Sequence, residues 1–294
     1  MKQTKEIIID IFEQKKKFDE KCFEAKIPRQ TMQQYLYTFL NQRYGLKTLI
    51  TDWGNSILNS VGKYKSEDID IALFDKIMNN ECDEEYRFVL IQLKNAMSEI
   101  LKDILRQKFK AKSDSEILKM LVKIQAGIIP DVFWKESLKM IYNNLHYKII
   151  EIKILDEIKR KRNQNEINLF KGNQKKINKD EVLSYIEFEK IVVQFQLESH
   201  TQYIKKFVNL FKMIDTNNDG IISKNEFIQM MQNINSNLNI PEASIVELIQ
   251  KADPLNMDQI NFSECVLLLL LEKINIMKGT DSSLSILEAY LYSI

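Results

Sequence analysis

One twelve-residue stretch places oxygen-bearing side chains at the spacing of a hard-cation site. The stretch reads DTNNDGIISKNE over residues 215–226. Calcium takes about seven oxygen ligands, and alternate residues of a tight loop can direct theirs to one point. Gly220 permits the sharp turn that this convergence requires. The sequence therefore predicts a Ca²⁺ site with these candidate ligands: Asp215, Asn217, Asp219, the backbone carbonyl of Ile221, Ser223 directly or through water, and both oxygens of Glu226.

A second stretch of the same length lacks most of these ligands. It reads DPLNMDQINFSE over residues 253–264, with Asp253 at the first position and Glu264 at the twelfth. Leu255 and Met257 stand where the third and fifth ligands should be. Two carboxylates cannot surround calcium without those oxygens. We therefore predict that this loop holds no metal.

The second loop still has a predicted structural role. It keeps the length of the first loop, although Pro254 stiffens its beginning and Asp258 replaces the glycine of the turn, two further departures from a calcium loop. Ile260 is the eighth residue of its loop, as Ile222 is of the first loop. We predict that these two isoleucines lie opposite each other in a short backbone bridge.

The residues that flank the first loop extend the pattern into two helices. Phe207, Phe211 and Ile214 stand eight, four and one residues before Asp215. After the loop come Phe227, Met230 and Met231. Together with the loop, this arrangement resembles the calmodulin-like EF-hand family. The resemblance implies paired helix–loop–helix units and calcium binding.

The elements that must position these loops are predicted to be helices. Only seven glycines and four prolines occur in 294 residues, so tight turns are scarce. Ser113 and Glu116 have the spacing of a capping box, and Ser199 with Gln202 forms a second such pair. We predict an all-α fold, with helices at about 181–197 and 200–214 leading into the first loop.

A change of composition suggests where the chain divides. Residues 159–180 are polar and rich in lysine and asparagine. We predict a helical domain of unknown role at 1–160, followed at 161–294 by an EF-hand module with one intact loop, one degenerate loop and a C-terminal helix. That last helix, at 284–292, either packs into the EF-hand groove or leaves the groove for a helix of another protein.

Charge and cysteine usage restrict the partners. The 42 basic and 41 acidic residues give a net charge of +1, so no overall field draws the chain to nucleic acid or to an anionic membrane. The longest apolar run, 266–271, is too short to span a bilayer. Cys22, Cys82 and Cys265 are far apart in the sequence, which argues against disulfides and zinc and favours a reducing, cytoplasmic compartment.

The sequence offers no arrangement typical of an enzyme. The two histidines, His146 and His200, have no neighbouring catalytic pattern, and no glycine-rich phosphate loop is present. The acidic pairs Glu84–Glu85 and Asp68 with Asp70 are interpreted as solubilising. We therefore predict a protein without catalytic activity.

Two functions fit these predictions. The first is a regulatory or structural subunit of a larger assembly. The segment YLYTFLNQRYGLKTLITDWG resembles EF-hand proteins of protist cilia, which implies the ciliary axoneme, a cytoskeletal assembly, as that assembly. The alternative is a mobile calcium sensor that binds a target helix of an enzyme or motor. Such a sensor exposes apolar surface when calcium binds, in a groove that Met213, Met230 and Met231 would line. Either function requires a protein partner.

Overall fold

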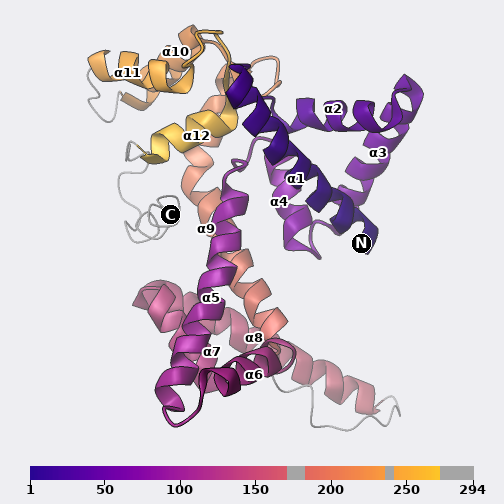
Figure 1. Cartoon of the computed structure of the whole chain (residues 1–294), viewed down its shortest axis with the longest axis vertical. Coiled ribbons are helices and arrows are strands. Elements are labelled where there is room, and N and C mark those ends of the chain that lie inside the picture. Colours follow the sequence, from indigo (N-terminus) through magenta and orange to yellow (C-terminus); the bar gives the residue numbers. More distant parts are fainter. Residues whose placement is uncertain (171–182, 236–241, 272–294) are drawn as a thin grey trace. The chain divides into compact units, whose positions relative to one another are not determined.

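The protein is predominantly helical (Figure 1). A computed structural model describes residues 1–170, 183–235 and 242–271. Within these ranges the strands form only one small antiparallel sheet of two strands. The predicted all-α class is confirmed. None of the described helices is long and apolar enough to cross a membrane. The predicted helix at 284–292 lies outside the described residues.

The chain forms two compact units that do not follow the predicted boundary. Within the described residues, the first unit joins 1–87 to 199–271, and the second comprises 88–198. The loops at 215–226 and 253–264 therefore belong to the same compact unit as the N-terminal helices, instead of forming a module separate from 1–160. The division differs because long helices, rather than the polar segment at 159–180, carry the chain from one unit to the other.

The N-terminal part of the first unit consists of four helices. They are α1 (Lys2–Ala25), α2 (Met32–Tyr44), α3 (Lys47–Tyr64) and α4 (Ile69–Met78). Thr31 and Gln34 form a capping box that begins α2. Asp68 caps α4 and pairs with Lys5 of α1 at 2.8 Å. Asp68 therefore has a structural role in addition to the solubilising one predicted.

The second unit contains α5 (Tyr86–Lys108) from residue 88 onward, α6 (Asp114–Gln125), α7 (Asp131–Ile141), α8 (Asn144–Phe170) and the first half of α9 (Tyr185–Ile214). The predicted capping box of Ser113 and Glu116 begins α6, which confirms that expectation. Trp134 of α7 is completely buried in this unit. A single antiparallel bridge joins Ile128 to Ser184, just before α9 begins.

The predicted helix boundary at Ser199 is wrong, because Ser199 lies within α9. The helix runs without a break from Tyr185 to Ile214, so Ser199 lies in its interior and does not cap a second helix. Buried apolar residues lie on both sides of this position, at Leu197 and Ile204. Their burial favours a continuous helix over the local capping signal.

The two loops lie in the C-terminal segment of the first unit. Helix α9 leads through the first loop to β1 (Ile221–Ile222) and α10 (Lys224–Asn235), and α11 (Glu242–Ala252) leads through the second to β2 (Ile260–Asn261) and α12 (Phe262–Leu271). The strands pair antiparallel with Ile222 opposite Ile260, as predicted.

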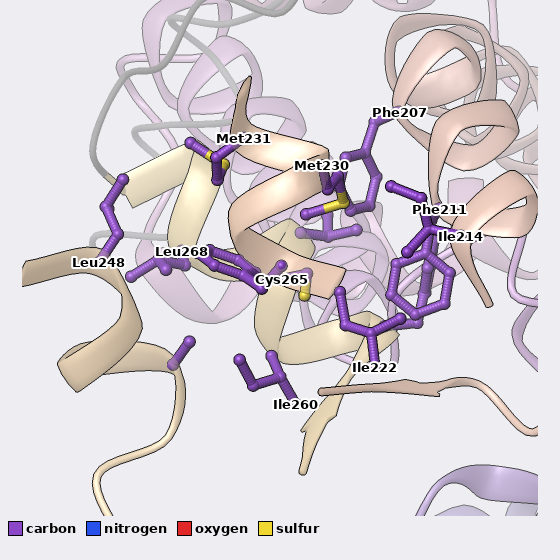
Figure 2. Close-up of a cluster of buried hydrophobic side chains, with 14 of the residues drawn as sticks. Phe207, Phe211, Ile214, Ile222, Met230, Met231, Leu248, Ile260, Cys265 and Leu268 are labelled. Carbon is purple, nitrogen blue, oxygen red and sulfur yellow. The ribbon is translucent and has the colours of Figure 1, made fainter. Parts of the chain in front are cut away.

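These helices enclose an apolar core of their own. Figure 2 shows Met230 close to Phe207 and Phe211, with Ile222 and Ile260 at the strands. Met230, Met231, Phe207 and Phe211 are all completely buried. The core fixes the directions of the helices that begin and end each loop, and so it positions the loop oxygens.

Candidate metal centre

Asp215, directly after α9, is the anchor of the first loop. Its side chain is buried, and its two carboxylate oxygens accept hydrogen bonds from the loop backbone. The N–H of Asp219 donates to Oδ1 at 3.2 Å, and that of Gly220 donates to Oδ2 at 2.9 Å. These bonds wrap the loop around the carboxylate. Gly220 has a φ of +76°, a conformation that glycine adopts without strain.

Asn217 and Asp219 lie on the same turn. Asn217 Oδ1 accepts from the N–H of Asp219 at 3.2 Å, and its Nδ2 donates to Asp219 Oδ2 at 3.0 Å. Asp219 Oδ1 accepts from the N–H of Ile221 at 2.9 Å. The structure therefore brings the first three predicted ligands together through hydrogen bonds around one turn.

The last two predicted side-chain ligands lie at the start of α10. Glu226 Oε2 accepts from the N–H of Ser223 at 2.7 Å and from its hydroxyl at 2.9 Å. Ser223 Oγ in turn accepts from the N–H of Glu226 at 3.3 Å. Glu226 and Ser223 thus form a capping box at the start of α10. Ile221, whose carbonyl is the remaining predicted ligand, pairs with Asn261 in the sheet.

The charge of the loop fits a divalent cation. Burial, with the neighbouring Asp219 carboxylate, raises the pKa of Asp215 above its usual range despite the backbone hydrogen bonds. Among the described residues, no lysine or arginine forms an ion pair with Asp215, Asp219 or Glu226. The donors are carboxylate, amide and hydroxyl oxygens, which hard cations prefer. A bound Ca²⁺ would supply the positive charge that this group of oxygens lacks.

The second loop has nearly the same backbone as the first. Asp253 accepts from the N–H of Met257 at 2.9 Å and from that of Asp258 at 2.8 Å, as Asp215 does from the fifth and sixth residues of its loop. Asp258 has a φ of +57° where the first loop has Gly220. Its side chain accepts from the N–H of Lys224 at 2.7 Å. The non-glycine residue is therefore held in the turn by a bond across to the first loop.

A lysine stands in for the cation in this second loop. Lys224 Nζ lies 3.3 Å from Asp253 Oδ2 and also contacts the side chain of Asn256. Burial alone would raise the pKa of Asp253, but the backbone hydrogen bonds and the Lys224 ammonium outweigh burial and lower it. The first aspartates of the two loops thus have pKa values shifted in opposite directions.

Comparison with known proteins assigns this part of the chain to a family. A family model described as an EF-hand domain pair matches residues 204–268. These residues form an EF-hand pair. The match confirms that this segment, as predicted, resembles the EF-hand superfamily, whose loops generally bind Ca²⁺. No curated protein and no solved structure matches the chain.

A buried cluster beside the EF-hand pair could not be predicted from the sequence. Cys82, Asp83 and His200 are completely buried and offer ligand atoms within 4.8 Å of one another. His200 Nε2 lies 2.8 Å from Asp83 Oδ2, and the ring of Tyr86 stacks on the imidazole at 3.6 Å. Burial raises the pKa of the Cys82 thiol to about 11, so this thiol is not a ready nucleophile. Asp83 and His200 are 117 residues apart, and no local spacing signals their contact.

The pair Glu84–Glu85 is not a solubilising pair, contrary to prediction. Arg29 Nη2 lies 2.9 Å from Glu84, and its Nη1 contacts Glu85. The ammonium of Lys15, itself almost completely buried, lies 3.2 Å from Glu84. The two glutamates therefore belong to a partly buried ion-pair network. This network lies near Glu264, whose pKa is raised to about 7 chiefly by burial, while Arg29 acts to lower it.

Proposed function

We propose that this chain is a non-catalytic calcium-binding protein that acts as a regulatory or structural subunit of a larger assembly. The observation that carries the proposal is the first loop, where Asp215 and Asp219 come together without a described basic partner while Lys224 fills the second loop. One Ca²⁺ would bind, to Asp215, Asn217, Asp219, the Ile221 carbonyl, Ser223 and Glu226.

The buried methionines favour a fixed subunit over a mobile sensor. Met230 and Met231 are completely buried in the core of the EF-hand pair, and only Met213 of the three predicted groove residues is exposed. A sensor must open this core to present an apolar groove. In the structure the core is filled by side chains of the pair itself, such as Phe207 and Leu268 (Figure 2).

An exposed apolar surface on α3 supports a protein partner. Leu46, Leu49 and Trp53, which follow one another at helical spacing, expose between 39% and 62% of their surface. Tyr44 stacks on Trp53 with ring centroids 5.2 Å apart, which gives this surface a rigid aromatic part. Contiguous exposed apolar surface is typical of interaction sites. These residues fall largely in the segment that resembles EF-hand proteins of protist cilia, so the assembly we propose is the ciliary axoneme.

A calcium titration combined with a dye that binds apolar surface tests the proposal. We expect calcium to bind the purified chain at physiological magnesium without an increase in dye fluorescence, because the core stays closed. Binding with a several-fold increase in fluorescence would instead support the alternative function, a mobile sensor of a target helix. Absence of binding would contradict calcium-dependent function altogether.

The cellular assignment has its own test. A tagged copy expressed in a ciliated protist should remain with the axoneme after detergent extraction of the membrane. Substituting Trp53 and Leu49 with serine should release it, because these side chains lie on the exposed apolar surface. Recovery of the unsubstituted protein only in the soluble cytoplasm would contradict the axonemal assignment.

A further inference from the structure

The linker between α4 and α5, residues 79–85, contacts the EF-hand pair at several separate points. Its sequence, NNECDEE, has four acidic side chains and no basic one. Both the linker and the EF-hand pair belong to the first compact unit. Its first contact is with the calcium loop itself.

Asn80 covers the turn of that loop. A Cβ atom added at Gly220 would lie 2.9 Å from Asn80 Nδ2 and 3.1 Å from its Oδ1. The amide therefore packs directly on the glycine whose N–H donates to Asp215. Asn80 itself has a φ of +51°, a conformation that asparagine tolerates better than most residues. A side chain at position 220 would force the Asn80 amide to shift.

Further contacts join the linker to α9, the helix that leads into the loop. Asp83 meets His200 at 2.8 Å in the completely buried cluster, and Glu81 pairs with Lys212 at 3.6 Å. Asp83 fixes the linker near the middle of α9, and Glu81 fixes it one turn before Asp215. Together with Asn80, these contacts hold the helix and the turn of the loop in one arrangement.

The far end of the linker is bound to the second EF-hand. The N–H of Glu84 donates to Ser263 Oγ of α12 at 3.0 Å. Phe262, the preceding residue, donates its N–H to the carbonyl of Gly220 at 3.0 Å. The linker, α12 and the turn of the calcium loop are thus connected through consecutive hydrogen bonds and contacts.

We propose that the α4–α5 linker is an intramolecular ligand of the EF-hand pair, and that its docking and calcium binding at 215–226 strengthen each other. This inference rests on the calcium binding proposed above. The docked linker holds Gly220 and α9 in the arrangement that brings the loop oxygens together, which lowers the cost of ordering the loop around calcium. The bound cation in turn orders the turn at Gly220 on which the Asn80 amide packs, which favours the docked linker. Coupling between two sites is reciprocal, so each event must favour the other by the same factor.

The decisive variant is Asn80→Gly, which removes the amide and keeps a residue that accepts positive φ. We expect it to raise the calcium dissociation constant about five- to tenfold, the lower range of typical allosteric coupling. Lys26→Gly is the matched control, because Lys26 also has a positive φ, of 55°, but caps α1 on the exposed surface. We expect its dissociation constant to stay within about twofold of the unsubstituted chain, well below that coupling range.

A second variant and a second measurement make the test independent of the folding of Asn80→Gly. Ser263→Ala removes the acceptor of the Glu84 N–H without changing the 215–226 loop, and it should weaken calcium binding in the same direction. In the unsubstituted chain, calcium should slow hydrogen exchange of the Glu84 amide.

The outcomes separate this inference from the proposed function. If the unsubstituted chain binds no calcium, the proposed function fails and the coupling with it. If it binds calcium but folded Asn80→Gly and Ser263→Ala keep its dissociation constant, or if calcium leaves exchange of the Glu84 amide unchanged, only the coupling is overturned.

Discussion

The loops at 215–226 and 253–264 hold their first aspartates in the same way. In each loop the N–H groups of the fifth and sixth residues donate to that carboxylate, at 3.2 and 2.9 Å in the first and at 2.9 and 2.8 Å in the second. What differs is the positive charge. Lys224 lies beside Asp253, whereas no described cation pairs with Asp215.

The second loop keeps the backbone hydrogen bonds of the first without its oxygen-bearing side chains. In the second loop Leu255 and Met257 supply no oxygen, yet backbone hydrogen bonds and the Lys224 ammonium satisfy the buried carboxylate. The first loop keeps its oxygens and has a buried aspartate with a raised pKa. The comparison therefore supports our proposal that the first loop binds calcium and that the second has a structural role.

The largest expected effect is loss of calcium binding in Glu226→Gln. The substitution removes the carboxylate that would bind calcium through two oxygens, so we expect the dissociation constant to rise by about 100-fold or more. Competition with a fluorescent calcium chelator measures the change. Glu264→Gln, at the equivalent position of the second loop, is the control and should bind as the unsubstituted chain does; equal losses in both variants would contradict the difference between the loops.

Restoring the missing ligands should make the second loop resemble the first. We expect the triple variant Leu255→Asp, Met257→Asp, Asp258→Gly to bind a second calcium ion, because the backbone of this loop already has the required turn. Lys224 would compete with the ion, so the new site should be weak, with a dissociation constant of about 10⁻⁴ to 10⁻³ M. Mass spectrometry of the native protein counts the ions; a variant that stays folded with one ion would show that the backbone similarity is insufficient.

Removing Lys224 should destabilise the fold, because the buried carboxylate of Asp253 loses its charged partner. In Lys224→Met we expect the free energy of unfolding at pH 7 to fall by about 1–2 kcal/mol, because a buried carboxylate loses a charged partner. The lowered pKa of Asp253 stabilises the fold above the aspartate's unfolded pKa, and this contribution is lost as pH falls through the folded pKa. The difference between variant and unsubstituted chain should therefore shrink at pH 3.

Urea denaturation at both pH values measures this difference. Lys2→Met, which removes an exposed pair with Glu6, is the matched control and should change stability by less than about 0.5 kcal/mol. An equal effect of the two substitutions would mean that Lys224 does not act as the substitute cation.

The smallest expected effect concerns Glu264, the last residue of the second loop. Its pKa of about 7 lies above the usual value, so the folded protein binds this proton more tightly than the unfolded chain and loses stability as pH rises toward 8. Glu264→Gln should therefore be more stable than the unsubstituted chain by about 1 kcal/mol at pH 8 and similar to it at pH 5. Thermal unfolding at the two pH values, in the absence of calcium, measures the change; a difference that does not depend on pH would contradict it.

The sequence predicted the features that depend on local spacing. The structure confirms the pairing of Ile222 with Ile260, which follows from the twelve-residue repeat. The calcium ligands from Asp215 to Glu226 and the absence of metal at 253–264 rest on the same repeat and stay predictions. The prediction that Ser199 begins a new helix was wrong, because buried residues on both sides of Ser199 favour one continuous helix.

Contacts between distant segments could not be predicted from one sequence. Asn80 meets Gly220, and Asp83 meets His200, without any local pattern that links them. Glu84 was interpreted as solubilising because its partner, Arg29, lies 55 residues earlier in the chain, between α1 and α2. The division of the chain into compact units depends on the same long-range contacts, which explains why composition alone suggested a different boundary.

Calorimetric titration of the unsubstituted chain with calcium, at physiological magnesium, tests the difference between the loops most directly. The account predicts one binding event per chain. It also predicts that this event disappears in Glu226→Gln and persists in Glu264→Gln. Two binding events per chain, or loss of the binding heat in Glu264→Gln, would contradict it.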